Sequence, residues 1–211
     1  EAMKANEFAA ATQLLQELVA ESSGEYEAWY FLAVCQRYGQ QWAASEASLK
    51  SCLEIDPNFG RAYQELGHLM LAQGKSREAV AAYLNAVRRN DSLLASWRQL
   101  IELGRSIGDK QLERDAIDQF KRLNGLPGAL LGVRNFLAEG KLLKAEDLCR
   151  AFLKQNPKHV EGMRLLADIG VKLSILDDAE FLLESALVFE PDNAFARFDY
   201  INVLHQRQKY A

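Results

Sequence analysis

Proline, glycine and cysteine are scarce in this sequence, whose 211 residues include four prolines, 13 glycines and three cysteines. The prolines and glycines stand at spaced intervals, which suits helices joined by short turns. Cys35, Cys52 and Cys149 form no C-x-x-C pair and are odd in number, which argues against a disulfide framework and indicates a reducing compartment. We therefore expect a cytoplasmic protein.

Long apolar runs and an excess of positive charge are also missing. No stretch approaches the roughly 18 uncharged apolar residues of a membrane helix. The first residues mix charges with alanine and leucine, unlike a signal peptide. The net charge of −4 provides no general attraction to phosphate backbones. We expect neither a membrane nor a nucleic acid as a partner.

Motifs for catalysis or cofactor binding do not occur. The sequence has neither G-x-x-x-x-G-K-[ST] nor G-x-G-x-x-G, so no loop is expected to hold a nucleotide, and it has no G-x-S-x-G elbow. His68, His159 and His205 are too dispersed to supply three or four converging metal ligands. Cys52 and Cys149 are expected to be buried structural residues. We expect no cofactor, no metal and no enzymatic activity of this chain itself.

What the sequence does contain is an internal repeat. Trp29, Tyr63 and Trp97 are equally spaced, each thirty-four positions after the one before, and each is followed three positions later by a leucine. A period of this length indicates a repeat architecture built from small supersecondary units.

The prolines follow the same period with one irregularity. Pro157 and Pro191 are one period apart, whereas the interval from Pro57 to Pro157 falls two positions short of three periods. Proline cannot continue a helix, and the Asn and Asp residues beside these prolines favour turns. We place the loss of two residues in the irregular stretch Gly108–Gly128.

Each unit also carries two small or apolar residues seven positions apart. Seven residues make two helical turns, so both members of a pair face the same neighbour. The pairs are Ser45/Cys52, Ala79/Ala86, Ala145/Phe152 and Ala179/Ala186.

This pattern resembles the tetratricopeptide repeat (TPR), W-x-x-L-G-x-x-Y…A-x-x-x-F…P. The best match consists of Tyr63, Leu66, Gly67, Ala79, Tyr83 and Ala86. The resemblance implies an all-α fold: a right-handed α-solenoid of antiparallel helical hairpins, the TPR-like superhelix. It also implies a scaffold that binds other proteins.

We predict one array over residues 1–211. It consists of a partial repeat, five hairpins of which the third is shortened, and the first helix of a truncated repeat: 1–25; 26–59, 60–93, 94–125, 126–159 and 160–193; and 194–211. A chain that begins and ends inside a repeat is expected to be a piece of a longer protein. The apolar residues Phe195, Phe198, Ile201 and Leu204 need cover, so the uncapped ends are possible sites of self-association.

In such arrays the first helices line a concave surface, where we expect a peptide or partner protein to bind. Arginines would grip carboxylates, and aromatic residues would supply rigid contact area. Alternatively, these positions are ordinary charged surface, and Tyr30 and Tyr38 pack between hairpins. The candidate groove residues are Tyr30, Phe31, Arg37, Tyr38, Arg61, Gln64, Glu65, His68, Arg98, Glu102, Arg105, Arg134, Arg164, Asp168 and Lys172.

Residues 94–211 bear a narrower resemblance. The shortened third unit, the weak first helix before Ala-Glu-Gly-Lys and the closing N-V-L-H-x-R-Q-K are similar to the N-terminal TPR array of bacterial sulfotransferase-family proteins. This resemblance implies that a further domain transfers sulfonate from phosphoadenylyl sulfate and that the array recruits the acceptor. No cofactor-binding residue of that family has a counterpart here. The alternative function is therefore a substrate-recruiting arm.

Overall fold

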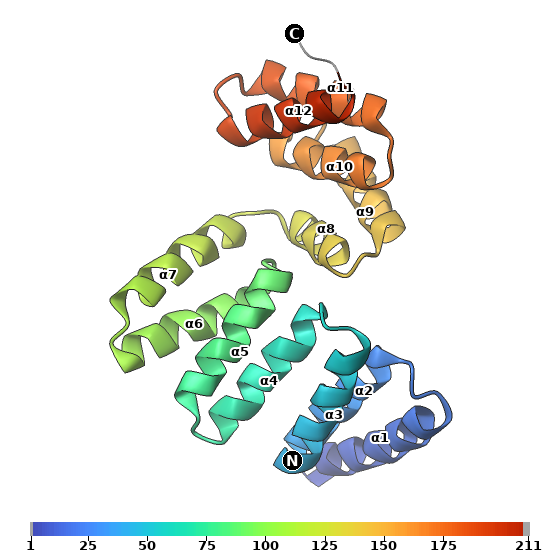
Figure 1. The fold of residues 1–211 in the computed structure, drawn as a ribbon, viewed down its shortest axis with the longest axis vertical. Coiled ribbons are helices and arrows are strands. Elements are labelled where there is room, and N and C mark those ends of the chain that lie inside the picture. The colour runs from blue at the N-terminus through green and yellow to red at the C-terminus, as the bar shows by residue number, and fades with distance from the viewer. Residues whose placement is uncertain (1, 209–211) are drawn as a thin grey trace. The chain divides into compact units, whose positions relative to one another are not determined.

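The computed structural model describes residues 2–208, with side chains from Ala10 onward, and within that range the chain forms twelve helices and no strand. Lys209, the last residue of the closing sequence motif, lies outside the described residues together with residues 1, 210 and 211. In chain order, the helices are α1 (Ala2–Glu21), α2 (Tyr26–Tyr38), α3 (Trp42–Ile55), α4 (Gly60–Ala72), α5 (Ser76–Arg89), α6 (Leu94–Ile107), α7 (Lys110–Asn124), α8 (Gly128–Ala138), α9 (Leu142–Gln155), α10 (Val160–Lys172), α11 (Leu176–Phe189) and α12 (Ala194–Gln206) (Figure 1).

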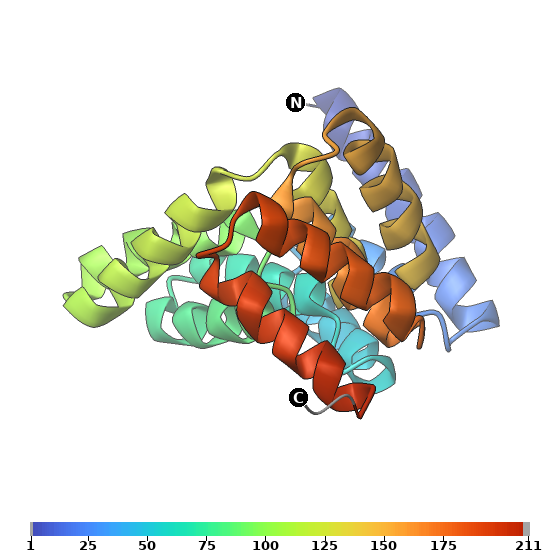
Figure 2. The same cartoon turned by 90° about the horizontal axis from the view of Figure 1, so that it is seen from above.

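The chain divides after Arg122 into two compact units. In the first unit α2 packs against α3 and α4 against α5, and in the second α8 packs against α9 and α10 against α11. Within each unit, Figures 1 and 2 show the two helices of a hairpin side by side and antiparallel. Contacts also join α2 to α4, α8 to α10, and α10 to α12. The predicted all-α fold of helical hairpins is confirmed, whereas the assignment of helices to individual repeats stays a prediction.

Six tight turns, five of them inside hairpins and one after α12, share one backbone feature, a residue with positive φ. These residues are Gln40, Gly74, Gly108, Gly140, Ser174 and Gln208, with φ between 55° and 78°. Successive members are one repeat period apart, except for the step from Gly108 to Gly140, which is two positions shorter. Glycine adopts this left-handed backbone without strain, whereas other residues do not. The turns at Gln40, Ser174 and Gln208 therefore have the same geometry as the glycine turns at some cost in strain.

Two turns between hairpins of the first unit are closed by side-chain oxygens. Asp56 Oδ1 accepts a hydrogen bond from the Asn58 N–H at 2.9 Å, and one period later Asn90 Oδ1 accepts one from the Ser92 N–H at 3.1 Å. Such local bonds compete with helical backbone bonds, so they end the preceding helix where the sequence places Asp or Asn.

Small residues bring the two helices of a hairpin together. The predicted pairs at seven-residue spacing are fully buried, apart from Phe152, which is half-buried. In two hairpins a small residue of the first helix and a residue sixteen positions later belong to the same buried cluster: Ala33 and Leu49, and Ala167 and Leu183. At the same spacing, Gly67 faces Tyr83 in the hairpin of α4 and α5, and Gly132 faces Leu148 in that of α8 and α9. The contact is closest between Gly67 and Tyr83, where the absence of a Cβ atom leaves room for the ring.

The aromatic residues that mark the period are half-buried, and the two tryptophans among them reach the turn before their helix. Trp29 Nε1 donates to the Ser23 carbonyl at 2.9 Å, and Trp97 Nε1 donates to the Asp91 carbonyl at 2.8 Å. These two residues therefore attach α2 and α6 to the preceding turns.

The apolar residues of α12 lack the cover that the sequence suggested they need. Phe195, Phe198 and Ile201 are each more than 60% exposed, and Leu204 is half-buried. The helix is held instead through Ala196 and Val203, which face α10 and α11.

Candidate functional site

All the predicted groove residues lie on first helices: α2, α4 and α6 in the first unit, α8 and α10 in the second. The side chains divide into those that tie one first helix to the next and those that remain at the surface. This division decides what a ligand can reach.

In the first unit an ion pair joins α2 to α4. The Arg37 guanidinium binds the Glu65 carboxylate, and Glu65 is only 4% exposed. A buried carboxylate is strongly disfavoured without a partner, so this arginine compensates a charge inside the protein. Arg37 also lies over the Tyr38 ring, 4.4 Å from its centroid. A ligand carboxylate at Arg37 would therefore share the guanidinium with Glu65 or displace it.

His68 takes part in a second internal contact. Its Nδ1 lies 2.7 Å from the Tyr83 hydroxyl, and the two rings meet edge to face. Burial lowers the pKa of His68 and raises that of Tyr83. Burial thus favours the neutral form of both groups, and in these forms the tyrosine hydroxyl can donate a hydrogen bond to the imidazole nitrogen.

The aromatic residues at the start of the first unit differ in exposure. Tyr30 is half-buried, with its ring 5.2 Å from that of Phe31 and 5.3 Å from that of Phe59, and burial raises its pKa. Phe31 and Tyr38 are 51% and 57% exposed. Tyr30 is therefore largely a packing residue, and Phe31 and Tyr38 form the accessible aromatic surface.

The remaining candidates of the first unit extend along α4 and α6. Gln64 Oε1 accepts a hydrogen bond from the Ser96 hydroxyl at 2.9 Å, and Arg61 is half-buried. Arg98 is exposed, with its guanidinium 5.7 Å from the Phe120 ring centroid.

Toward the C-terminal end of α6, Glu102 is exposed and Arg105 Nε lies 3.0 Å from Glu113 Oε1. The accessible surface here is of mixed charge.

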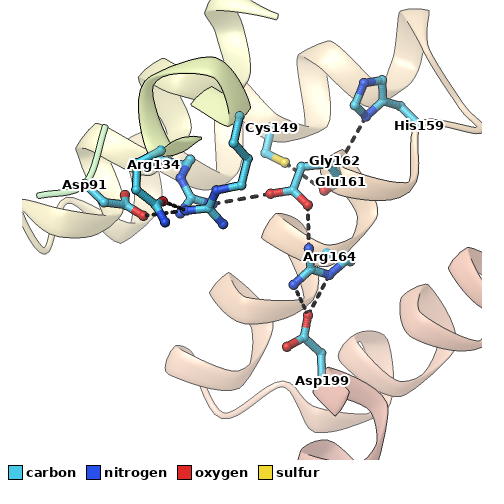
Figure 3. Close-up of polar contacts among 10 residues, drawn as sticks. Asp91, Arg134, Cys149, His159, Glu161, Gly162, Arg164 and Asp199 are labelled. Atoms are coloured by element: carbon cyan, nitrogen blue, oxygen red, sulfur yellow. Dashed lines mark hydrogen bonds and ion pairs between the residues drawn. The ribbon is translucent and has the colours of Figure 1, made fainter. Parts of the chain in front are cut away.

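In the second unit a chain of ion pairs links helices α8, α10 and α12 (Figure 3). Arg134 Nη1 of α8 lies 3.3 Å from Glu161 Oε1 of α10, whose other oxygen lies 2.5 Å from Arg164 Nη1. Arg164 Nε and Nη2 each lie 2.8 Å from Asp199 Oδ2 of α12. All four side chains are partly shielded from solvent, and each lies beside a group of opposite charge. Shielding from water strengthens these ion pairs.

Beside this chain a hollow of about 150 Å³ opens between α10, α11 and α12. Apolar side chains from these helices, including Leu183, line it together with polar groups. The polar residues are Arg164, Asp168, Asp199, Asn202 and Gln206. Lys172 Nζ lies 3.2 Å from Asp168 Oδ1, and both side chains are nearly half exposed.

The sequence pointed to Arg164 and Asp168 but missed Asp199, Asn202 and Gln206. Asn202 stands one period after Asp168, so the repeat carried the signal that could have found it. Asp199 follows Arg164 one position out of register, and only the contact between α10 and α12 identifies it.

Two of the three cysteines are enclosed in the core of the hairpins. Cys52 and Cys149 are fully buried, as predicted, and burial raises their pKa values to about 12 and about 11. The Cys149 thiol donates to the Gly162 carbonyl at 3.3 Å. Among the described residues no group of three or more His, Cys, Asp and Glu side chains could hold a metal ion.

The same part of the chain contains no helix whose length and apolar character would let it span a bilayer.

Solved structures show the same architecture. A tetratricopeptide repeat protein from Parabacteroides merdae ATCC 43184 is 12% identical, with 98% of this chain and 83% of that chain covered and a TM-score of 0.52. The APC/C hetero-tetramer Cut9–Hcn1 gives 16% identity, coverage of 99% of this chain and 41% of that chain, and a TM-score of 0.51. At such identities the likeness establishes the fold alone.

Sequence relationships go further. Small glutamine-rich tetratricopeptide repeat-containing protein 2 of Mycosarcoma maydis is 35% identical over 94 residues, which are 41% of this chain and 26% of that protein. The chain thus matches about a quarter of this relative's length. One sequence model described as tetratricopeptide repeat matches residues 1–58 and 130–197, more than half of the chain, and another matches residues 49–81. The chain therefore belongs to the tetratricopeptide repeat family.

Proposed function

We propose that this chain is a protein–protein interaction module that binds a peptide or a partner protein along its first helices, without catalysis of its own. Tetratricopeptide repeats generally act as protein-interaction scaffolds and are typically non-catalytic. The observation that carries the proposal is the hollow between α10, α11 and α12, which polar and apolar side chains line together. Ligand sites commonly combine an apolar base with a few polar groups that orient the ligand.

The ion pairs refine the kind of ligand expected. Arg37, Arg105, Arg134 and Arg164 each lie within ion-pair distance of a carboxylate of this chain. They are thus partly neutralised, which weakens the case for a strongly acidic ligand. We propose a ligand of mixed character that contacts the exposed Phe31 and Tyr38 in the first unit, or Asp168 and Asn202 in the second.

Peptides selected for binding to this chain from a random displayed library would test the proposal. We expect Asp168→Lys or Glu102→Lys to weaken selected peptides about tenfold or more, because each reverses an exposed charge on a first helix. Glu54→Lys makes the same change on the outer helix α3 and should leave affinity unaltered. Peptides that lose affinity with Glu54→Lys but not with either first-helix variant would refute a site on the first helices.

The alternative function rests on the narrower resemblance of residues 94–211. In this proposal the array is the recruiting arm of a longer protein whose further domain transfers sulfonate. An assay of the longer protein with phosphoadenylyl sulfate, with and without residues 1–211, would test it. Loss of transfer to a protein acceptor, with transfer to a small acceptor retained, is the expected result. Equal transfer to both acceptors without the array would refute it.

A further inference from the structure

The outer face of α11 carries a stripe in which the exposed apolar residues Phe181 and Val188 flank the half-buried Ser185. Phe181 is 68% and Val188 75% exposed, and the spacing of four and three residues places the three side chains on one face of the helix. The Ser185 hydroxyl donates to the Phe181 carbonyl at 2.9 Å, so its polar group is satisfied within the helix. The α11 stripe therefore presents an almost wholly apolar surface to solvent.

The same register positions are small or charged in the other outer helices. One period before Phe181 and Val188, helix α9 carries Asp147 and Lys154, both exposed. The corresponding pairs are Ala47 and Glu54 in α3, and Ala81 and Arg88 in α5, again exposed. The repeat thus tolerates polar residues at these places, and its packing does not require an apolar pair.

Continuation of the array would not cover the stripe. Helices α3 and α5 are each followed by further helices of the first unit, yet Glu54 and Arg88 remain exposed. By the same geometry, a further helix after α12 would leave Val188 at the surface. Exposed apolar side chains mark an interaction surface when they share one face, as Phe181 and Val188 do, and not when they are scattered singly.

The charges around the stripe indicate which partner fits. Helix α11 contains four acidic residues and no lysine or arginine. Asp177 and Glu184, seven positions apart, lie along one edge of the stripe, and the exposed Asp178 lies at its N-terminal end. Lys158 approaches only the far end, with its Nζ 5.8 Å from the Phe189 ring centroid.

This acidic border disfavours two occupants. Two copies of α11 packed face to face would bring like charges together, although Arg207 already offsets Asp177 and Glu180. A membrane surface bearing anionic lipids would likewise repel it. We propose that the α11 stripe is a docking site for an amphipathic helix of a partner protein, whose apolar face is flanked by lysine or arginine. This site is separate from the one proposed on the first helices.

Two synthetic helical peptides of about 18 residues, with the same leucine face, would probe the site in fluorescence anisotropy with the whole chain. One peptide carries lysine beside the leucines and the other carries glutamate. We expect the lysine peptide to bind at least about tenfold more tightly, with an affinity that falls as salt is raised. Equal binding of the two peptides would overturn the proposal.

A double variant separates docking on α11 from general attraction to an acidic protein. Phe181→Asp with Val188→Lys installs the residues that α9 carries, so the fold should be retained and the melting temperature unchanged. We expect it to weaken the lysine peptide at least about tenfold. Leu143→Ser, at a residue 70% exposed on α9, should have no effect. Peptide affinity unchanged in the double variant would overturn the proposal. The proposal would also be overturned if the chain formed a dimer, or adsorbed to anionic vesicles, and the double variant abolished that association.

Discussion

Gly67→Ala places a methyl group inside the contact between α4 and α5. A Cβ atom at this position would lie 2.6 Å from Tyr83 Cε1 and 2.7 Å from Cδ1 and Cζ, well inside van der Waals contact. Tyr83 is fully buried, and its hydroxyl lies 2.7 Å from His68 Nδ1, so the ring cannot simply turn away. The methyl group must therefore push the two helices apart or break the Tyr83–His68 contact.

Overpacking a buried site typically lowers stability by about 1–3 kcal/mol, whereas replacing a helical glycine by alanine returns about 1 kcal/mol. Because three ring atoms overlap with the new methyl group, the upper half of that range applies. We expect Gly67→Ala to lower the free energy of unfolding by about 1–2 kcal/mol.

The other hairpins supply the compensating change. Ala33 and Leu49, which stand one period before Gly67 and Tyr83, are buried in the same cluster and combine a larger small residue with a smaller partner. Tyr83→Leu alone should destabilise the chain by about 2–3 kcal/mol, because it leaves a void and removes the hydroxyl from His68. In the double variant the methyl group fills part of that void, so its destabilisation should be about 1–2 kcal/mol less than the sum of the two single changes.

Urea unfolding followed by far-ultraviolet circular dichroism would measure all three variants. Repeat arrays can unfold in steps, so equal m-values are needed before the midpoints are compared. A free energy of unfolding for Gly67→Ala equal to that of the parent chain would contradict the predicted overpacking. Additive effects of the two changes would contradict the predicted compensation, since additivity would mean that the two side chains do not share a contact.

Two further predictions follow from buried titratable groups. The folded chain lowers the pKa of His68 through burial, so the unfolded chain binds the proton first as pH falls. The free energy of unfolding should therefore decrease as pH drops through about 6.5, and less so in His68→Asn; equal pH dependence of the two chains in urea titrations would contradict this. Burial, and then Asp56, raises the pKa of Cys52 to about 12, so a thiol reagent should label the half-buried Cys35 first and Cys52 only on unfolding; equal labelling rates by mass spectrometry would argue against it.

The sequence predicted only part of the candidate site. The period identified Arg164 as a first-helix residue, and a free arginine suggested a grip on ligand carboxylates. That role stays a prediction, and in the structure Arg164 bridges Glu161 and Asp199. Arg37 likewise binds the buried Glu65. Nothing in the spacing of charges along one helix states whether the next helix brings a carboxylate within reach.

The sequence by itself determined the all-α fold of helical hairpins and the small, buried positions where paired helices meet. It could do so because helical periodicity is local, and each hairpin buries its apolar face mainly against its neighbours in the chain. Only the tertiary structure decided which charged side chains compensate one another, and that Phe181 and Val188 lie at the surface. Those outcomes depend on how far apart successive helices stand and on which face each helix leaves uncovered, and both follow from packing between elements.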